Sequence, residues 1–294
     1  MKILLILGPL NEKRISMTNY ANYCKNIYQS KGLEVEIFRL KIINSKNSLI
    51  RAFSRYFLVP FQMIHKKADI FHLIDHSYGH SLIFSKSTCF STIHDLIPLE
   101  IKKEESYVKS SISKLFFYFI ISITLKKSSK IFVASMSTIN LLDKFFNKPR
   151  NLILAYNPPI NKKLPNLDCS VKDIDILLIG SNFYKNNNFA FNTCLKIKKK
   201  LSITWINPNM SLVRNIGKTK HEINTLRNIS DHELFKIYSR AKVILNLSLS
   251  EGFGWTPFEA SFFDCCSLMS DINIFREIHP SSLVYLQPLK NVDR

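Results

Sequence analysis

The stretch "SEGFGWTPFEA" at residues 250–260 places two glutamates and two glycines within eleven positions. The whole chain has only seven glycines, so Gly252 and Gly254 in one short loop indicate a sharp turn that approaches another group closely. The apolar, β-branched run at 242–248 predicts a buried strand before this loop. The residue types therefore favour close contact between backbone amides and a ligand.

A helix is expected directly after the loop. Thr256 suits the N-cap, Pro257 the first helical position and Glu259 the third, which together make a capping box. The free N–H groups and the positive end of the helix dipole would face the same point as the loop amides. The strand, loop and helix start together predict a site that binds a phosphate.

The chain is strongly basic, with a formal net charge of +19 over 294 residues. Residues 1–150 hold 23 basic and 10 acidic side chains, while residues 151–294 hold 18 and 12. This excess indicates an anionic partner such as a phospholipid surface, nucleic acid or a phosphorylated substrate. Lysines outnumber arginines 31 to 10, so a general composition bias explains the charge equally well.

Cysteine usage and the apolar runs indicate the compartment. The six cysteines show no C-x-x-C spacing, which is typical of free thiols in a reducing environment. The N-terminal run at 2–7 reads as a first strand, and the longest apolar run, 115–125, is far shorter than the roughly 20 residues that span a bilayer. The sequence therefore predicts a cytoplasmic protein without a membrane-spanning segment.

Strand-like and helix-like runs alternate along the chain, which predicts parallel sheets covered by helices on both faces. A proline-rich stretch at 157–173 interrupts the alternation and reads as a linker. We therefore expect two Rossmann-like α/β domains, at 1–160 and 161–294, with ligands bound beyond the carboxyl ends of the strands in a cleft between them. The expected strands are 2–7, 34–38, 69–74, 87–93, 130–135, 152–156, 174–180, 202–206 and 242–248.

At this point the sequence resembles a known family. "EGFGWTPFEA" is similar to the E-x7-E signature of retaining glycosyltransferases of family 4, which have the GT-B fold. The likeness runs in order over roughly residues 2 to 290 and is not confined to that motif. The further matching segments are "STIHDLIPL", "IFVASMSTINLL", "LILAYNPPI", "LLIGSNFYKNNN" and "ISDHELFKIYSRAKVILNLSLSEGFG".

The resemblance implies the following chemistry. A nucleotide-diphosphate sugar would bind mainly to the second domain, and a glycan or lipid-linked acceptor mainly to the first. A hexosyl group, for instance mannosyl, would be transferred with retention at the anomeric carbon and without a metal or other cofactor. Such a protein would work on surface polysaccharide or glycolipid at the inner face of the cell membrane, with no nucleic acid as partner.

Three side chains are candidate catalytic residues by this resemblance. Glu251 matches the glutamate that contacts the donor sugar and the reacting region, and Lys185 matches the lysine that neutralises the departing diphosphate. His94 matches a histidine at the donor sugar or reacting centre. Each residue has an open alternative: Glu251 as a solvated loop acid, Lys185 as one lysine among many, and His94 as a structural histidine bonded to a neighbouring loop.

The other candidate residues would bind the donor nucleotide. Glu259 would hold the ribose hydroxyls, Arg227 and Asn228 would lie at the base, and the amides of Phe253 to Thr256 would hold the diphosphate. The complete donor-binding set is Gly180, Ser181, Lys185, Arg227, Asn228, Glu251, Gly252, Phe253, Gly254, Trp255, Thr256 and Glu259.

The sequence departs from the family pattern in three places. Tyr184 stands where the family often has an arginine, so half of a cationic clamp is lacking or comes from elsewhere, for instance from Arg214. The loop after the first strand keeps only Gly8 of the family's glycines. The chain stops at "LKNVDR", where the family continues with closing helices, so we expect a truncated or shortened second domain. These departures leave a catalytically inactive sugar-nucleotide binder as the main alternative.

Two other segments carry open alternatives. His72, His76 and His80 cluster without cysteine or glutamate partners at metal-ligand spacing, so no zinc site is expected. The segment 45–67 places Arg51 and Arg55 one turn apart among large apolar residues. It suits contact with an anionic membrane or packing on the sheet, and a basic membrane- or nucleic-acid-binding protein is the weaker alternative.

Overall fold

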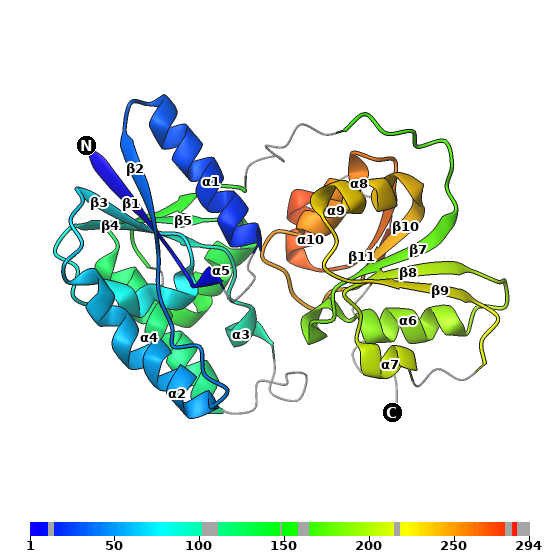
Figure 1. Ribbon diagram of the computed structural model, residues 1–294, viewed down its shortest axis with the longest axis horizontal. Coiled ribbons are helices and arrows are strands. Elements are labelled where there is room, and N and C mark those ends of the chain that lie inside the picture. Colours follow the sequence, from blue (N-terminus) through cyan, green and yellow to red (C-terminus); the bar gives the residue numbers. More distant parts are fainter. Residues whose placement is uncertain are drawn as a thin grey trace. The chain divides into compact units, whose positions relative to one another are not determined.

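The computed structural model describes residues 1–10, 15–101, 111–147, 149–157, 165–214, 218–279 and 284–286. The described residues form two compact units, the first within 1–100 and 111–157 and the second within 165–286, with Ile101 grouped with the second (Figure 1). Residues 165–173 contain neither helix nor strand, as predicted for the linker. The remainder of that linker, the loop at 11–14 and the predicted early end at 289–294 lie outside the described residues.

A six-stranded parallel sheet forms the centre of the first unit, with the order β2-β1-β3-β4-β5-β6. Successive residues of β1 point to opposite faces, as the period of a strand requires. Leu4 and Ile6 pack with Met63 on one face, and Leu5 packs with Ala21 on the other. Both faces are therefore covered, which explains the near-continuous apolar runs of these strands. The strands are β1 (Lys2–Leu7), β2 (Glu34–Arg39), β3 (Ile70–Leu73), β4 (Thr88–Ile93), β5 (Lys130–Val133) and β6 (Leu152–Leu154).

Helical segments surround this sheet (Figure 1). The sequence indicates a basic helical segment near 47–66, and the structure breaks it into an α, a π and a 3-10 piece, with Pro60 at the start of the last piece. The segments are α1 (Ile15–Ser30), α2 (Ser48–Phe53), η2 (Ser54–Leu58), η3 (Val59–Met63), η4 (His76–Leu82), α3 (Ile97–Glu100), α4 (Ser111–Lys127) and α5 (Met136–Phe146). Among the described residues, no helix combines the length and the apolarity that crossing a bilayer requires.

The second unit contains another six-stranded parallel sheet, with the order β12-β11-β10-β7-β8-β9. From β7 the chain adds β8 and β9 on one side, then returns to add β10, β11 and β12 on the other. The strand order therefore reverses between β7 and β10, and such a switch point is where parallel α/β sheets bind ligands. The strands are β7 (Ile174–Ile179), β8 (Ser202–Ile206), β9 (Glu222–Leu226), β10 (Ala241–Asn246), β11 (Cys266–Ser270) and β12 (Val284–Leu286).

The elements of the second unit match the sequence prediction in part. The sequence predicts a helix near 231–240 capped by Ser230 and Glu233, and α8 begins with this capping box. The sequence also indicates a helix near 187–200, and the structure ends it early, at Leu195. The strand β9 was not predicted, because "EINTL" is a short, polar edge strand with little apolar patterning. The segments are η5 (Phe183–Lys185), α6 (Asn187–Leu195), α7 (Met210–Arg214), α8 (Asp231–Arg240), α9 (Trp255–Ser261) and α10 (Asn273–Ile278).

Candidate functional site

The loops that follow β7 and β10 meet at the switch point of the second unit. Since these strands are parallel neighbours, with Ile244 opposite Leu177, their carboxyl ends lie side by side. The N–H of Leu249 donates to the carbonyl of Tyr184 at 2.7 Å, which fixes the loop after β10 to η5. Strand order thus brings together residues that lie more than sixty positions apart in the sequence.

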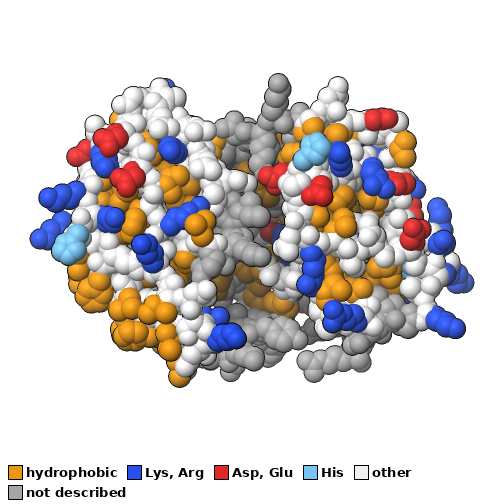
Figure 2. All heavy atoms as spheres, viewed as in Figure 1, with side chains coloured by type: hydrophobic (Ala, Val, Ile, Leu, Met, Phe, Trp, Pro, Cys, Tyr) orange, Lys and Arg blue, Asp and Glu red, His pale blue; other side chains and the backbone are white. Residues whose placement is uncertain are grey.

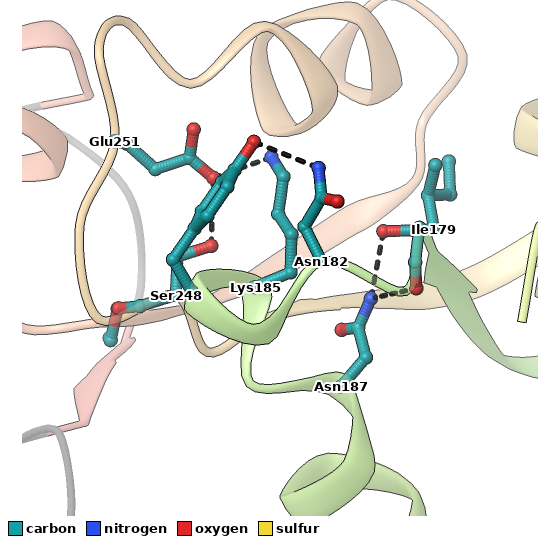
Figure 3. Close-up of polar contacts among 9 residues, drawn as sticks. Ile179, Asn182, Lys185, Asn187, Ser248 and Glu251 are labelled. Carbon is teal, nitrogen blue, oxygen red and sulfur yellow. Dashed lines mark hydrogen bonds and ion pairs between the residues drawn. The ribbon is translucent and has the colours of Figure 1, made fainter. Parts of the chain in front are cut away.

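Lys185 and Glu251 form an ion pair at this junction (Figure 3). The Nζ atom of Lys185 lies 2.5 Å from Oε1 of Glu251, and the Ser248 hydroxyl donates to the same oxygen at 2.7 Å. The side chains are only 21% and 10% exposed. Figure 3 shows the other carboxylate oxygen of Glu251 pointing away from Lys185. The structure therefore joins two of the three predicted catalytic residues in one contact.

The contact with Glu251 keeps Lys185 in its charged form. Burial alone would lower the pKa of Lys185, but the charge of Glu251 and the hydrogen bond to it outweigh burial, so this pKa is raised above its ordinary value. A lysine with a raised pKa is a permanent cation at neutral pH. Lys185 can therefore bind an anion without first taking up a proton.

Two side chains hold the turn that carries Lys185 by hydrogen bonds to backbone carbonyls. The Trp205 Nε1–H group donates to the Gly180 carbonyl at 2.8 Å. The Asn187 amide donates to the carbonyls of Ile179 and Gly180 at 2.7 and 2.9 Å (Figure 3). Gly180 has a φ of 91°, which L-residues rarely adopt. The sequence indicated Gly180 but gave no sign that Trp205 and Asn187 support the turn.

The helix start after Glu251 differs from the sequence prediction. The N-cap of α9 is Gly254, with a φ of 85°, and Thr256 is the second helical residue. The predicted capping box of Thr256 with Glu259 was therefore wrong. Because glycine adopts the left-handed region easily, it can end the loop two residues earlier than a threonine cap would. Pro257 still lies in the first turn, where its missing N–H removes no helical hydrogen bond.

Gly254 is also required by packing. A Cβ atom at this position would lie 2.7 Å from Cε1 of Phe275, which is fully buried. Glycine at this position is thus required for the loop to pack, and it also lets a ligand approach the loop amides.

This double constraint predicts a stability difference between two glycine variants of the same unit. Gly254→Ala should lower the free energy of unfolding by about 2–4 kcal/mol, since it adds a clash to the backbone strain. Gly180→Ala is the matched control, because it has a positive φ but its Cβ would lie 3.9 Å from the nearest atom, Cγ of Lys185. It should cost only about 1–2 kcal/mol. Equal losses in urea unfolding would contradict the role of Phe275.

The remaining donor-binding candidates of the loop follow Glu251 directly. Phe253 is buried and packs against Trp255, with ring centroids 5.0 Å apart. Gly252 and Thr256 are half-buried. Glu259 accepts a hydrogen bond from the Tyr238 hydroxyl at 3.2 Å, so its carboxylate is oriented by a buried tyrosine of α8. Its contact with a ribose stays a prediction.

Arg227 and Asn228 are exposed and follow the edge strand β9. Asn228 is oriented by its N–H, which donates to Oδ1 of Asn207 at 3.2 Å. Two strand spacings, about 10 Å, separate β9 from β7 within the sheet, and the contact of Arg227 and Asn228 with the base stays a prediction. Ser181 and Arg214 are also exposed.

His94, the third catalytic candidate, belongs to the first unit and follows β4. Its ring is buried, and Nε2 lies 3.1 Å from the Ile74 carbonyl. The ring packs edge-to-face with Tyr20, with centroids 4.9 Å apart. Burial, together with the neighbouring His76, lowers the pKa of His94 to about 4. The ring is thus neutral at physiological pH and bonded to the backbone of the first unit.

His72 and His80 are buried in the same unit. His72 bonds with the Tyr28 hydroxyl at 3.0 Å and with the Thr92 hydroxyl at 2.9 Å. His80 lies 2.7 Å from the Arg55 carbonyl through Nε2. Burial lowers their pKa values to about 3 and about 4. Within the described part of the chain, no cluster of histidine, cysteine, aspartate or glutamate side chains is arranged to hold a metal ion.

These buried histidines predict a loss of stability in mild acid. An unfolded histidine takes up a proton below its ordinary pKa of 6.5, whereas His94 does so only near pH 4. Between these values the unfolded state binds more protons, so each buried histidine lowers the free energy of unfolding by about 1.4 kcal/mol per pH unit. Urea unfolding between pH 6.5 and 5 should show this slope reduced in His94→Gln. The exposed His232→Gln should keep it, and an unchanged slope in His94→Gln would disprove the assignment.

The chain matches no known family model. It is 25% identical over 212 residues to the O-antigen chain mannosyltransferase RfbU of Salmonella typhimurium. The aligned region covers 67% of this chain. The chain spans only 56% of the length of that relative.

Solved structures of two other proteins share the fold. Sucrose-phosphate synthase from Thermosynechococcus elongatus has a TM-score of 0.66 at 16% identity, covering 94% of this chain and 82% of its own. Anabaena HepE in complex with UDP and glucose has a TM-score of 0.59 at 11% identity, covering 93% and 82%. The chain has the GT-B fold. The GT-B prediction from the sequence is confirmed, and Lys185 and Glu251 lie in the second of its two parallel-sheet units.

Proposed function

We propose that the chain is a glycosyltransferase that moves a hexosyl group, such as mannosyl, from a nucleotide-diphosphate sugar to a glycan or lipid-linked acceptor. The Lys185–Glu251 pair carries this proposal, because it places a cation and a carboxylate at the switch point of a parallel sheet. Similarity to an O-antigen chain mannosyltransferase supports a role in surface polysaccharide or glycolipid synthesis. The likeness to a structure that holds UDP and glucose supports a nucleotide-sugar donor.

Lys185 stabilises the leaving diphosphate in this proposal. Negative charge grows on the phosphate as the glycosidic bond breaks, and a preformed cation in a half-buried site lowers the energy of that state. Lys185 already has an anionic partner, so it is held in place before the donor arrives. The lysine supplies positive charge at the diphosphate, and the proposed transfer is therefore independent of a metal.

Glu251 binds the transferred sugar in this proposal. One of its oxygens is held by Lys185 and Ser248, while the other points away from Lys185 and can accept a hydrogen bond from a sugar hydroxyl (Figure 3). The sugar would then contact Glu251 and the diphosphate would contact Lys185, two adjacent side chains of opposite charge. This arrangement positions the anomeric carbon next to the leaving group, and positioning is a large part of the rate acceleration.

The proposed transfer proceeds with retention. The acceptor hydroxyl arrives on the face from which the diphosphate departs, and the departing phosphate oxygen takes up the hydroxyl proton. The new glycosidic bond forms as the bond to phosphate breaks, so the step requires no enzyme nucleophile. The reaction is proposed to take place in the cytoplasm, at the inner face of the cell membrane when the acceptor is lipid-linked, with no nucleic acid as partner.

An inactive sugar-nucleotide binder is the second candidate, and Tyr184 favours it. Its hydroxyl accepts a hydrogen bond from the Asn182 amide at 3.1 Å, and its ring lies 5.8 Å from Nζ of Lys185. A neutral phenol therefore occupies the position next to Lys185 where the resemblance leads one to expect an arginine. Incubation with UDP-, GDP- and ADP-sugars separates the two functions. Release of nucleotide supports the transferase, whereas thermal stabilisation by a nucleotide without release supports the binder.

A further inference from the structure

An exposed apolar face covers part of the first unit, over α2 to η3 and α4. We call it the apolar face; its members are Leu49, Phe53, Phe57, Phe61, Leu115 and Phe119, each more than half exposed. Figure 2 shows hydrophobic side chains gathered over α2 and α4, at the lower left of the view. Six such side chains expose on the order of 600 Å² of apolar surface, the upper end for a soluble monomer. A patch of this size indicates a partner.

The two parts of the apolar face are joined through aromatic rings. Tyr56 of η2 stacks on Phe116 of α4, with centroids 5.0 Å apart. Phe53 and Phe57 stack on each other at 5.3 Å, one helical turn apart. The face is therefore continuous across segments that lie some sixty residues apart in sequence.

The exposed side chains are not needed by the core beneath them. The opposite side of the same segment is already packed, since Val59 and Met63 are buried against Leu4 and Phe71. Gln62 fixes η3 further through two hydrogen bonds with the backbone of Lys41, at 2.8 and 2.7 Å. In α4, Ile121 and Thr124 are fully buried and anchor the helix. The segments are thus rigidly held, with their apolar residues turned outward.

The segments that carry the apolar face hold basic side chains and no acidic ones. Residues 40–68 contain six lysines and arginines and no acidic residue, and α4 contains three lysines and no acidic residue. Lys46, Arg51 and Lys67 are exposed. Arg55 does not join them, because its guanidinium lies over the Tyr78 ring at 4.5 Å and donates to the Ser77 hydroxyl. Of these two arginines, which lie one turn apart in the sequence, Arg51 is exposed and Arg55 is half-buried.

We propose that the apolar face docks on an anionic lipid bilayer, with its phenylalanines and leucines in the interface and Lys46, Arg51 and Lys67 at the headgroups. Aromatic and aliphatic side chains flanked by basic residues are the composition that binds such interfaces. A second copy of this chain is a poor occupant, because a two-fold contact would bring the same basic residues together. The proposal goes beyond the proposed transfer activity and does not depend on it.

Flotation with vesicles tests the docking directly. The protein should float with vesicles of equal parts phosphatidylcholine and phosphatidylglycerol and not with phosphatidylcholine alone, and high salt should weaken the binding. Phe53→Ser with Phe57→Ser should weaken it by about tenfold for each phenylalanine. The matched control is Val171→Ser with Phe262→Ser, which removes two exposed apolar side chains from the second unit.

A charge series completes the test. Lys46→Gln, Arg51→Gln and Lys67→Gln together should weaken binding to anionic vesicles by about fivefold per charge. The control variant removes the same charge from the exposed surface of the second unit and should change vesicle binding little; it combines Lys196→Gln, Lys198→Gln and Lys200→Gln. The proposal would be overturned if the protein did not float with anionic vesicles, or if it bound neutral vesicles equally well. It would also be overturned if the control variants lost as much vesicle binding as the variants of the apolar face and its basic residues. So would a dimer in sedimentation that the phenylalanine variant converts to a monomer. Nucleotide binding by the same preparations shows independently whether the proposed function holds.

Discussion

Replacing Lys185 by glutamine is expected to lower the turnover number for sugar transfer by about a hundred- to a thousandfold. This is the loss that follows when one preorganised group that stabilises transition-state charge is removed. Lys185 is well placed to have such an effect, since it is 21% exposed and its pKa is raised by Glu251, so its charge is present throughout the neutral range. The measurement is the rate of nucleotide release from the donor that the wild-type chain turns over.

The control for this variant is another paired lysine of the same unit. Lys242 contacts Asp175 at 2.6 Å, but its side chain is 50% exposed and it lies near the start of β10, away from the loop at its end. Lys242→Gln should therefore leave the turnover number within about twofold of the wild type, because exposed ion pairs contribute little. Turnover by Lys185→Gln equal to that of Lys242→Gln would contradict the role of Lys185. Circular dichroism of both variants shows whether the fold is retained.

Replacing Glu251 by glutamine is expected to lower kcat/KM for transfer by about a hundredfold, which corresponds to the loss of a charged hydrogen bond to the sugar. The same change should leave the affinity for the free nucleoside diphosphate equal or increased. The reason is that Glu251 holds Lys185 in the unliganded structure and competes with the diphosphate for its ammonium group. Lys185→Gln, by contrast, should weaken both transfer and nucleotide binding.

The opposite effects on binding and transfer distinguish a sugar-binding carboxylate from a merely structural one. A structural role would lower transfer and nucleotide affinity together, through disorder of the loop. Glutamine keeps the size of the side chain and can still accept from the Ser248 hydroxyl, so the loop should stay in place. Glu222→Gln, an exposed glutamate on the edge strand β9, is the matched control. Reduced nucleotide affinity in Glu251→Gln would refute the competition between the carboxylate and the diphosphate.

Much of the architecture could be predicted from local pattern. Apolar runs such as 2–7 and 174–180 predicted β1 and β7, because strands buried on both faces are nearly continuous in apolar residues. The polar edge strand β9 lacks that signal and was missed. The start of α9 was misplaced because Gly254 and Thr256 are both acceptable caps, and only packing against Phe275 decides between them.

The contact between Lys185 and Glu251 could not be predicted from the residues alone. Both were selected, but their pairing depends on β7 lying next to β10, which is a property of strand order. The role of Trp205 could not be predicted for the same reason. This residue belongs to β8, and its side chain donates to the Gly180 carbonyl at the end of the neighbouring strand. Likewise, local sequence placed Arg51 and Arg55 together, whereas the ring of Tyr78 draws Arg55 into the unit.

Titration calorimetry with UDP, GDP and ADP tests most directly whether the Lys185–Glu251 junction binds a nucleotide diphosphate. One of these nucleotides should bind the wild-type chain, bind Lys185→Gln about 10- to 100-fold more weakly, and bind Lys242→Gln as it binds the wild type. Absence of binding by all three, or equal affinity of the wild type and Lys185→Gln, would contradict the account.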